Sequence, residues 1–273
     1  MKMKPVVRNI KVDELFNFTD KVVFITGAGG VGRICAKGFG LQKARIVLFD
    51  VKDEVCEKTC SELKGLGIEA AYVTGNIAEQ KSVNAAVDEV VSKYGRIDIL
   101  IHTAGVTKNK VCTEHTQEDV DFVIDINLKG TIYVNQAVAR VMKKQNYGKI
   151  VDIGSVGGAL SHMDVTMTYE ASKAGVHAIV KSFANEMAPY NINVNAIAPF
   201  WINTPFISHQ PKEYFEAVQR LTPFKRCLEA EELVGAAYYL ASDASNFVTG
   251  QVLFVDGGYT SVHAMSMEEL GLI

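Results

Sequence analysis

Short apolar runs alternate along the chain with longer segments in which apolar residues recur at helical spacing. Runs rich in Val, Ile and Phe are typical of strands that are buried on both faces of a sheet. Such runs predict strands at 21–26, 45–49, 70–74, 98–102, 149–153, 192–197 and 252–255. Helical spacing predicts helices at 31–41, 53–66, 79–93, 117–143 (irregular near Asn127), 169–187 and 230–240.

This alternation predicts an α/β fold with one doubly wound parallel sheet and helices on both of its faces. We expect a single domain at 21–260, with an N-terminal arm at 1–20 and a C-terminal tail at 261–273. The stretch at 199–227 shows neither pattern. Because irregular connections of that length are usually functional or mobile, we expect this stretch to be a lid that sets substrate choice.

Composition agrees with one large globular domain and argues against several kinds of partner. The chain has 273 residues, 48% of them hydrophobic, which suffices for one large core. A formal net charge of −3 offers no footprint for nucleic acid, and no apolar run approaches the ~20 residues that cross a bilayer. The arm lacks the apolar core of a signal peptide. We expect a cytoplasmic protein that binds neither nucleic acid nor membranes.

The cysteines carry no metal or disulfide signature. Their odd count argues against a disulfide framework. Cys56 and Cys60 would share a helix face, but no histidine or second cysteine pair completes a metal site. We expect free thiols and no bound metal.

A glycine-rich turn joins the first predicted strand to the helix at 31–41. Gly27-Ala-Gly-Gly-Val-Gly32 has the G-x-G-x-x-G spacing, which allows a tight turn and brings a pyrophosphate close to the N–H groups of a helix start. Asp50 ends the second predicted strand, eighteen residues after Gly32. A carboxylate there suits the ribose hydroxyls of NAD and repels a 2′-phosphate. The sequence therefore predicts an NAD site.

Tyr169 and Lys173 are four residues apart on a predicted helix, so their side chains lie on one face. A Lys⁺ beside a phenol lowers a pKa that starts near ~10, which makes the phenol a proton-transfer group near neutral pH. Ser155 follows a predicted strand. Ligands bind beyond the carboxyl ends of parallel strands, so we expect the residues that follow strands to line one crevice. They are 27–32, Asp50, Asn76, 104–105, Ser155 and 199–204.

In order and spacing, these motifs resemble the short-chain dehydrogenase/reductase family over about 21–258. The resemblance rests on Thr26 with the glycine turn, Asp-Ile-Asn127-Leu-Lys-Gly, Ile153-Gly-Ser155, Tyr169 with Lys173, Asn195-Ala-Ile-Ala-Pro199 with Ile202 and Thr204, and Val255-Asp-Gly-Gly258. It implies a Rossmann-like fold, a nicotinamide cofactor, a small-molecule substrate and a homotetramer. The catalytic residues it implies are Asn127, Ser155, Tyr169 and Lys173, of which Ser155 and Tyr169 also meet the substrate.

The same resemblance, together with the glycine motif, implies a set of cofactor contacts. They are Gly27, Gly29, Gly30, Val31, Gly32, Asp50, Asn76, Ile77, Ala104, Gly105, Tyr169, Lys173, Pro199, Ile202 and Thr204. The family's mechanism implies that Tyr169 moves the hydroxyl proton and that Lys173 lowers the pKa of Tyr169 and holds the nicotinamide ribose. Ser155 would hydrogen-bond the reacting oxygen, and Asn127 would hold a water that links Lys173 to solvent.

Four positions depart from the family pattern. The glycine turn is one residue shorter than usual. His102-Thr-Ala-Gly105 stands where the family has Asn-Asn-Ala-Gly, and we expect His102 to replace a structural hydrogen bond. Asn76 replaces an aspartate near the adenine, although its amide oxygen can still accept a hydrogen bond. Phe200 replaces a glycine, and with Trp201 it crowds the nicotinamide, caps the substrate pocket or packs under the loop.

We therefore expect an NAD(H)-dependent oxidoreductase that interconverts a secondary alcohol and a ketone. A 3-oxoacyl reductase or a hydroxysteroid dehydrogenase is an alternative within the family. The former usually uses NADPH, against which Asp50 argues. A non-catalytic nucleotide-binding sensor or scaffold is an alternative of another class, but such proteins typically lose the Tyr or the Lys of the pair.

The substrate is less clearly specified by the sequence. The arm at 13–18 resembles that of gluconate 5-dehydrogenase-like members, which favours a sugar acid or polyol. Candidate contacts for carboxylate or hydroxyl groups are His162, His209, Lys212 and Arg226. Candidates for an apolar pocket that would suit a steroid-like alcohol are Met163, Met167, Trp201 and Phe206.

Overall fold

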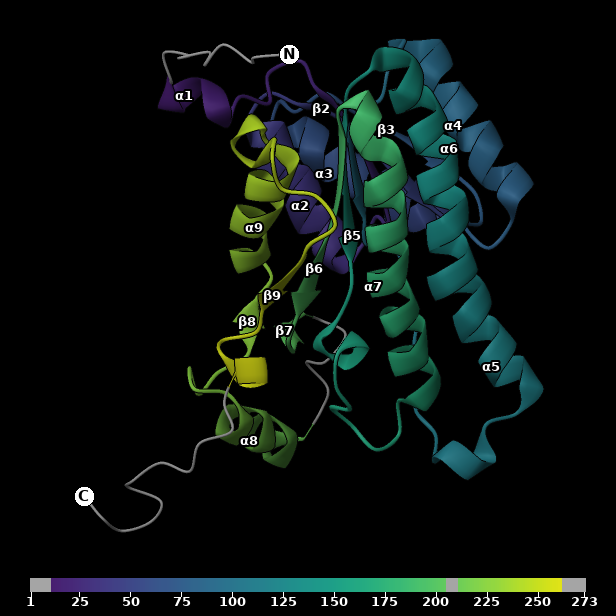
Figure 1. Ribbon diagram of the computed structural model, residues 1–273, viewed down its shortest axis with the longest axis vertical. Coiled ribbons are helices and arrows are strands. Elements are labelled where there is room, and N and C mark those ends of the chain that lie inside the picture. The colour runs from purple at the N-terminus through teal and green to yellow at the C-terminus, as the bar shows by residue number, and fades with distance from the viewer. Residues whose placement is uncertain (1–10, 205–210, 262–273) are drawn as a thin grey trace, which may run out of the picture.

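The computed structural model describes residues 11–204 and 211–261. A seven-stranded parallel sheet with the order β3-β2-β1-β4-β5-β6-β9 forms the centre of the molecule (Figure 1). Its strands are Val22–Thr26 (β1), Arg45–Asp50 (β2), Ala70–Thr74 (β3), Ile99–His102 (β4), Gly148–Ile153 (β5), Ile192–Pro199 (β6) and Val252–Val255 (β9). The strand order reverses beside β1, so the predicted doubly wound sheet is confirmed.

Helices cover both faces of this sheet (Figure 1). The first face carries Gly30–Leu41 (α2), Asp53–Gly65 (α3) and Glu232–Ala241 (α9). The second carries Gln80–Tyr94 (α4), Gly130–Gln145 (α6) and Met167–Met187 (α7). The remaining α-helices are Val12–Leu15 (α1), Gln117–Ile124 (α5) and Lys212–Leu221 (α8). Single-turn 3-10 helices lie at Cys112–Glu114, Val156–Gly158, Ala188–Tyr190, Asp243–Ser245 and Tyr259–Ser261.

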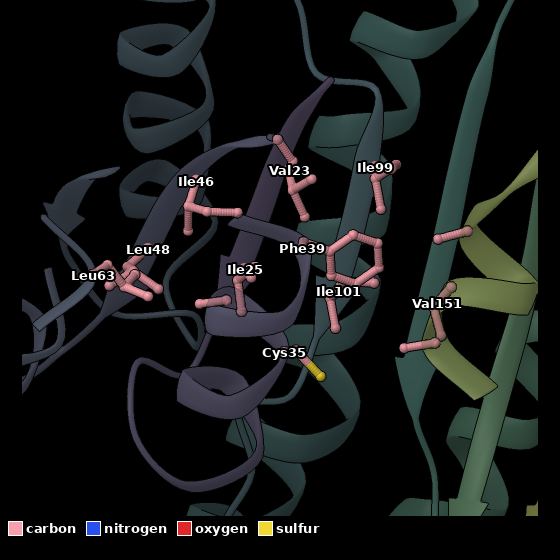
Figure 2. Close-up of a cluster of buried hydrophobic side chains, with 14 of the residues drawn as sticks. Val23, Ile25, Cys35, Phe39, Ile46, Leu48, Leu63, Ile99, Ile101 and Val151 are labelled. Atoms are coloured by element: carbon pink, nitrogen blue, oxygen red, sulfur yellow. The ribbon is translucent and has the colours of Figure 1, made fainter. Parts of the chain in front are cut away.

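The alternation of side chains along each strand divides the interior into two hydrophobic clusters. Val23 and Ile25 of β1 face α2, whereas Val22 and Phe24 face the opposite helices. All four side chains are fully buried, which explains why the strands read as continuous apolar runs rather than as alternating ones. Figure 2 shows the first cluster, with the labelled side chains Val23, Ile25, Cys35, Phe39, Ile46, Leu48, Leu63, Ile99, Ile101 and Val151.

Most predicted elements agree with the structure to within two residues at each end. The predicted helix at 117–143 is interrupted at Asp125–Lys129 by a π-turn, in which the N–H of Gly130 donates to the carbonyl of Asp125. The expected irregularity near Asn127 is therefore confirmed. Asn127 lies in the middle of this turn, where the wider helical spacing changes the direction of its side chain relative to α5 and α6.

The stretch at 199–227 is more regular than the sequence suggests. Ile202–Asn203 (β7) pairs with Leu228–Glu229 (β8), and α8 follows Pro211. Only Val218 of α8 is fully buried, although Tyr214, Val218 and Leu221 recur at helical spacing along one side of this helix. The prediction of a wholly irregular segment is wrong for these residues. Residues 205–210 lie outside the described part of the chain.

Part of the N-terminal arm joins the main core. Phe18 is 2% exposed and meets Phe39 of α2 edge-on, with ring centres 4.9 Å apart, and its ring centre lies 5.0 Å from that of Tyr238 of α9. Within residues 11–204 and 211–261, no helix combines the length and the apolar character that a membrane crossing requires.

The strand register places three predicted site segments side by side. Thr26 at the end of β1 lies opposite His102 at the end of β4, and His102 lies opposite Asp152 of β5. The glycine turn, the segment that begins at Thr103 and Ser155 therefore all leave the sheet at the same edge.

Candidate active site

The glycine turn has a backbone that only glycine can form at two positions. Gly27 has a φ of +82°, in the left-handed region, and a Cβ on Gly32 would lie 1.8 Å from the carbonyl oxygen of Gly27. Gly29 is the N-cap of α2, and no side chain caps the first N–H groups of that helix. The shortened turn therefore still presents an open helix N-terminus and side-chain-free backbone, which fits a pyrophosphate.

Asp50 is held against this turn by two backbone hydrogen bonds. The N–H of Ala28 donates to Oδ2 at 2.8 Å, and the N–H of Lys52 donates to Oδ1 at 3.0 Å. The carboxylate is thus fixed beside the glycine turn, at the end of β2, with acceptor positions left for further donors. This placement suits hydrogen bonds from ribose hydroxyls.

Ser155, Tyr169 and Lys173 come together beyond the end of β5. The Ser155 hydroxyl lies near enough to the Tyr169 hydroxyl to lower the pKa of the phenol. Ser155 Oγ also accepts from the N–H of Gly157 at 3.0 Å. Lys173 Nζ donates to the carbonyl of Ile153 at 2.7 Å and lies 5.7 Å from the centre of the Tyr169 ring. The structure therefore places the predicted Ser, Tyr and Lys in one site.

The electrostatics of this group differ from the sequence prediction. Burial raises the pKa of Tyr169 above its usual value, and the Ser155 hydroxyl opposes this rise only in part. Burial also lowers the pKa of Lys173 to about 8, against the attraction of Asp152. The predicted lowering of the Tyr169 pKa by Lys173 is therefore not found in this structure, where burial raises that pKa and only the Ser155 hydroxyl opposes the rise.

Asn127 anchors the segment after β4 to the catalytic helix. Its Oδ1 accepts from the N–H of Val106 at 2.8 Å, and its Nδ2 donates to the Val106 carbonyl at 2.8 Å and to Ser172 Oγ at 3.0 Å. A Cβ on Gly105 would lie 3.3 Å from Asn127 Oδ1 and 3.5 Å from Lys173 Nζ. The Asn127 amide therefore fixes the backbone of Val106 and the side chain of Ser172, both of which lie close to Lys173. Ser172 was not predicted, and its only signal in the sequence is its place next to Lys173.

His102 has the structural role expected for it. Nδ1 is 2.6 Å from Thr26 Oγ1, and Nε2 is 3.0 Å from Thr131 Oγ1. Thr131 Oγ1 donates in turn to the carbonyl of Asn127 at 2.6 Å, so it must accept from Nε2–H, which leaves Nδ1 to accept from Thr26. A directed chain of hydrogen bonds therefore joins β1, before the glycine turn, to the π-turn that carries Asn127. Thr131 was not predicted.

Replacing His102 with Asn should make the protein less sensitive to acid. Burial, with a smaller contribution from Lys173, lowers the pKa of His102 from 6.5 to about 3. The ring is neutral in both states above pH 6.5, but as the pH falls from 6.5 towards 3 only the unfolded chain takes up the proton, and stability is lost. The wild type should lose ~2 kcal/mol more than His102→Asn between pH 7 and pH 5 in urea unfolding, at ~1.4 kcal/mol per pKa unit. Equal losses in both proteins would contradict a neutral buried ring.

The other predicted cofactor contacts occupy different surroundings. The side chain of Asn76 stays local, since its Oδ1 accepts from the N–H of Ala78 at 3.0 Å and its Nδ2 donates to Glu79 at 3.1 Å. Ile77 is buried against Gly130. Pro199 ends β6, and Thr204 lines a cavity of about 140 Å³ with the start of α2. That cavity is lined by Gly30, Arg33, Ile34, Asn203, Thr204, Ala230 and Glu231.

The two aromatic residues after Pro199 have different roles. Phe200 is 4% exposed and packs with Val156 and Val218, so it lies under the loop. Trp201 is half-buried, donates a hydrogen bond from Nε1 to the Tyr214 hydroxyl, and lies 4.9 Å, ring centre to ring centre, from His162.

Several candidate substrate contacts already have partners in the structure. Arg226 forms an ion pair with Glu232 at 2.6 Å, and Lys212 forms one with Glu216 at 3.1 Å. His162 hydrogen-bonds to Glu170, and it alone of these three also lies next to Tyr169, with ring centres 6.3 Å apart. His209 and Phe206 lie outside the described residues.

Met163 and Met167 do not form an apolar pocket around the reacting groups. With Glu170, they line a cavity of about 490 Å³ between α7 and the segment 157–164, and neither Ser155 nor Tyr169 lines that cavity. This cavity therefore belongs to another surface of α7, so these two methionines do not support a steroid-like substrate.

Comparison with known proteins agrees with this geometry. Residues 26–260 match the family model described as Enoyl-(Acyl carrier protein) reductase. The 3-oxoacyl-(acyl-carrier-protein) reductase of Thermotoga maritima is 38% identical over 239 residues, which cover 87% of this chain and 97% of the relative. The 5-keto-D-gluconate 5-reductase of Escherichia coli is 35% identical over 250 residues, which cover 90% and 98%.

A solved structure gives the same result. The gluconate 5-dehydrogenase from Burkholderia cenocepacia, in complex with NADP and tartrate, superposes with a TM-score of 0.87 at 33% identity. The match covers 91% of this chain and 98% of that one. The similarity therefore extends over the sheet, its helices and the residues around Tyr169.

Proposed function

The chain belongs to the short-chain dehydrogenase/reductase family of oxidoreductases that act on alcohols and ketones, and we propose that it is an NAD(H)-dependent member that acts on a polyol or sugar acid. The observation that carries this proposal is the meeting of Ser155, Tyr169 and Lys173 at the sheet edge where the glycine turn and Asp50 also lie. The cofactor would be held by the glycine turn, Asp50, Lys173 and the backbone at 104–105.

The reaction needs a group that exchanges a proton with the substrate oxygen. We assign this role to Tyr169, since its hydroxyl lies beside Ser155 and its ring lies beside Lys173. Ser155 donates to or accepts from the same substrate oxygen and stabilises the charge that develops there. When bound, NAD⁺ supplies the hydride acceptor and a positive charge that favours the phenolate.

Lys173 and Asn127 position the groups around Tyr169. Lys173 Nζ is fixed by the carbonyl of Ile153 and lies next to the backbone of Gly105, a position from which it reaches both the phenol and a ribose. Asn127 holds the segment containing Gly105 and Val106 in place. Both Nδ2 hydrogens of Asn127 already have partners, so the proposed water between Asn127 and Lys173 would donate to Oδ1, which accepts only one hydrogen bond in this structure.

Asp50 is expected to make the enzyme prefer NAD(H) to NADP(H). Its carboxylate is fixed beside the glycine turn, and a 2′-phosphate there would meet a like charge. We expect kcat/KM with NAD(H) to exceed that with NADP(H) by ~10-fold or more, which corresponds to ~1.4 kcal/mol. Asp50→Asn, which removes the charge but keeps the shape, should narrow this ratio. Equal or better use of NADP(H) by the wild type, as in the solved relative's complex, would refute the assignment.

A 3-oxoacyl reductase is the second candidate, because the relative that is 38% identical carries that name. Steady-state rates with an acyl-carrier-protein substrate and with polyols, measured side by side, distinguish the two.

We further propose a cytoplasmic homotetramer in which 199–227 acts as a lid. β9 is an edge strand with Leu253 exposed, as a subunit contact through that edge requires.

A further inference from the structure

We propose that His162 is a specificity-determining residue, which accepts a hydrogen bond from a substrate hydroxyl on the carbon next to the reacting one. The proposal rests on the alcohol–ketone reaction at Tyr169 and identifies a group that the site recognises beyond the reacting oxygen.

The imidazole of His162 lies against three parts of the reaction site. Its ring centre is 6.3 Å from that of Tyr169 and 4.9 Å from that of Trp201. On a third side it meets the turn after Ser155, since a Cβ on Gly157 would lie 2.7 Å from His162 Nδ1 and Cε1. A substrate whose oxygen meets Tyr169 and Ser155 therefore brings its neighbouring carbons within reach of this ring.

Glu170 fixes which nitrogen of the ring carries the hydrogen. Burial pushes the pKa of Glu170 upward, but hydrogen bonds from the backbone and ring of His162 and from Thr166 outweigh burial and lower it. Glu170 Oε1 accepts from His162 N at 2.9 Å, from Nδ1 at 2.8 Å and from Thr166 Oγ1 at 3.1 Å. An ionised carboxylate is only an acceptor, so Nδ1 carries a hydrogen.

The other ring nitrogen of His162, Nε2, is then an acceptor without a donor. In the neutral ring Nε2 can only accept, and it has no hydrogen-bond partner within residues 11–204 and 211–261. The His162 side chain is 11% exposed, and Nε2 is not among the fully buried unpaired atoms of the described residues, so a substrate hydroxyl would take the place of water at this acceptor. A substrate hydroxyl satisfies this nitrogen, whereas a simple alcohol or ketone leaves it unpaired.

Charge around the site favours a neutral donor over an anion. The ring of His162 is neutral and donates to Glu170, while Arg226 is paired with Glu232 and Lys212 with Glu216, so none of these candidate contacts offers an anion an unpaired positive charge. A polyol and a sugar acid share the hydroxyl that His162 recognises. The His162–Glu170 pair would not hold the carboxylate of the acid.

The experiment compares cyclohexane-1,2-diol with cyclohexanol in the wild type, His162→Phe and His162→Gln. Phe fills the volume without a nitrogen, and Gln restores an acceptor near the position of Nε2. We expect His162→Phe to lower kcat/KM for the diol by about tenfold, the usual effect of one hydrogen bond, with cyclohexanol changed less than about twofold. His162→Gln should recover part of the loss, and NADH affinity should stay the same in all three. D-Glucitol and D-gluconate, run in parallel, show which source of hydroxyls is used.

Binding is read independently of turnover through Trp201, the single tryptophan, whose ring contacts His162. With saturating NADH, the diol should change Trp201 emission in the wild type at concentrations at which cyclohexanol does not. Equal loss of both substrates in His162→Phe, or equal emission changes with both ligands in the wild type, would overturn the proposal. A wild type that oxidises neither alcohol with NAD or NADP would instead refute the alcohol–ketone function, and the emission titration would still decide the role of His162.

Discussion

Tyr169→Phe should lower kcat by ~10²–10⁴-fold and leave both the fold and the affinity for NADH nearly unchanged. The substitution removes one oxygen, the only atom through which the ring meets Ser155 and the substrate proton. Because burial raises the pKa of this phenol, the apolar ring of Phe suits the same surroundings without a loss of packing. Single-turnover rates and NADH fluorescence titrations, measured on the same preparation, separate chemistry from binding.

Tyr239→Phe is the matched control, since Tyr239 lies on α9 with 37% of its surface exposed and far from the reacting groups in sequence and fold. It should keep the wild-type kcat. Retention of most of the turnover in Tyr169→Phe would mean that another group moves the proton. A large loss of NADH affinity in that variant would mean that Tyr169 acts mainly in binding.

Gly32→Ala should weaken NADH binding by at least ~100-fold, because its methyl group would lie 1.8 Å from the carbonyl oxygen of Gly27. The obstructing atom belongs to the backbone, so no side-chain rotation relieves the clash, and the turn must open. An opened turn no longer directs the N–H groups of α2 at one point. NADH titration by fluorescence gives the affinity, and urea unfolding gives the accompanying loss of stability.

Two further glycine variants make this result interpretable. Gly235→Ala lies in α9 with nothing within 4 Å of the new methyl, so it should bind NADH normally and be slightly more stable. Gly29→Ala has an ordinary φ of −95° and its nearest neighbour, Val55, at 3.7 Å, so it should fold normally while its methyl obstructs a pyrophosphate. Wild-type NADH affinity in Gly32→Ala and Gly29→Ala together would show that the cofactor does not use this turn.

The sheet and its helices were largely predictable, because buried parallel strands appear in the sequence as short continuous runs of apolar residues. The runs at 70–74 and 252–255 coincide with β3 and β9, each ended by residues that interrupt the apolar pattern. α8 was missed although Tyr214, Val218 and Leu221 recur at helical spacing, because the helix has only 10 residues and only Val218 of them is fully buried. Its position depends on packing against Phe200, which no local pattern reveals.

The residues of the site were predictable, but their electrostatic state was not. Spacing alone places Tyr169 and Lys173 on one helical face, yet how much solvent surrounds the phenol depends on segments distant in sequence. The carboxylate partners of His162 and Arg226 could not be predicted either, because the fold brings the partners together. Glu170 reaches His162 only because the segment between them folds back on α7, and Arg226 finds Glu232 across β8.

The hydrogen-bond chain through His102 has a consequence for how this sheet can change in evolution. A neutral imidazole offers one acceptor and one donor, and a primary amide offers at least one of each. His102 and the asparagine of the related motif can therefore accept from one neighbour and donate to the other in the same order, over different distances. Replacement of Thr131 by a residue without a hydroxyl would leave Nε2–H unpaired and buried, whereas a change at Thr26 would leave Nδ1 unpaired. We therefore expect a substitution at position 26, 102 or 131 to restrict which residues the other two positions can accept.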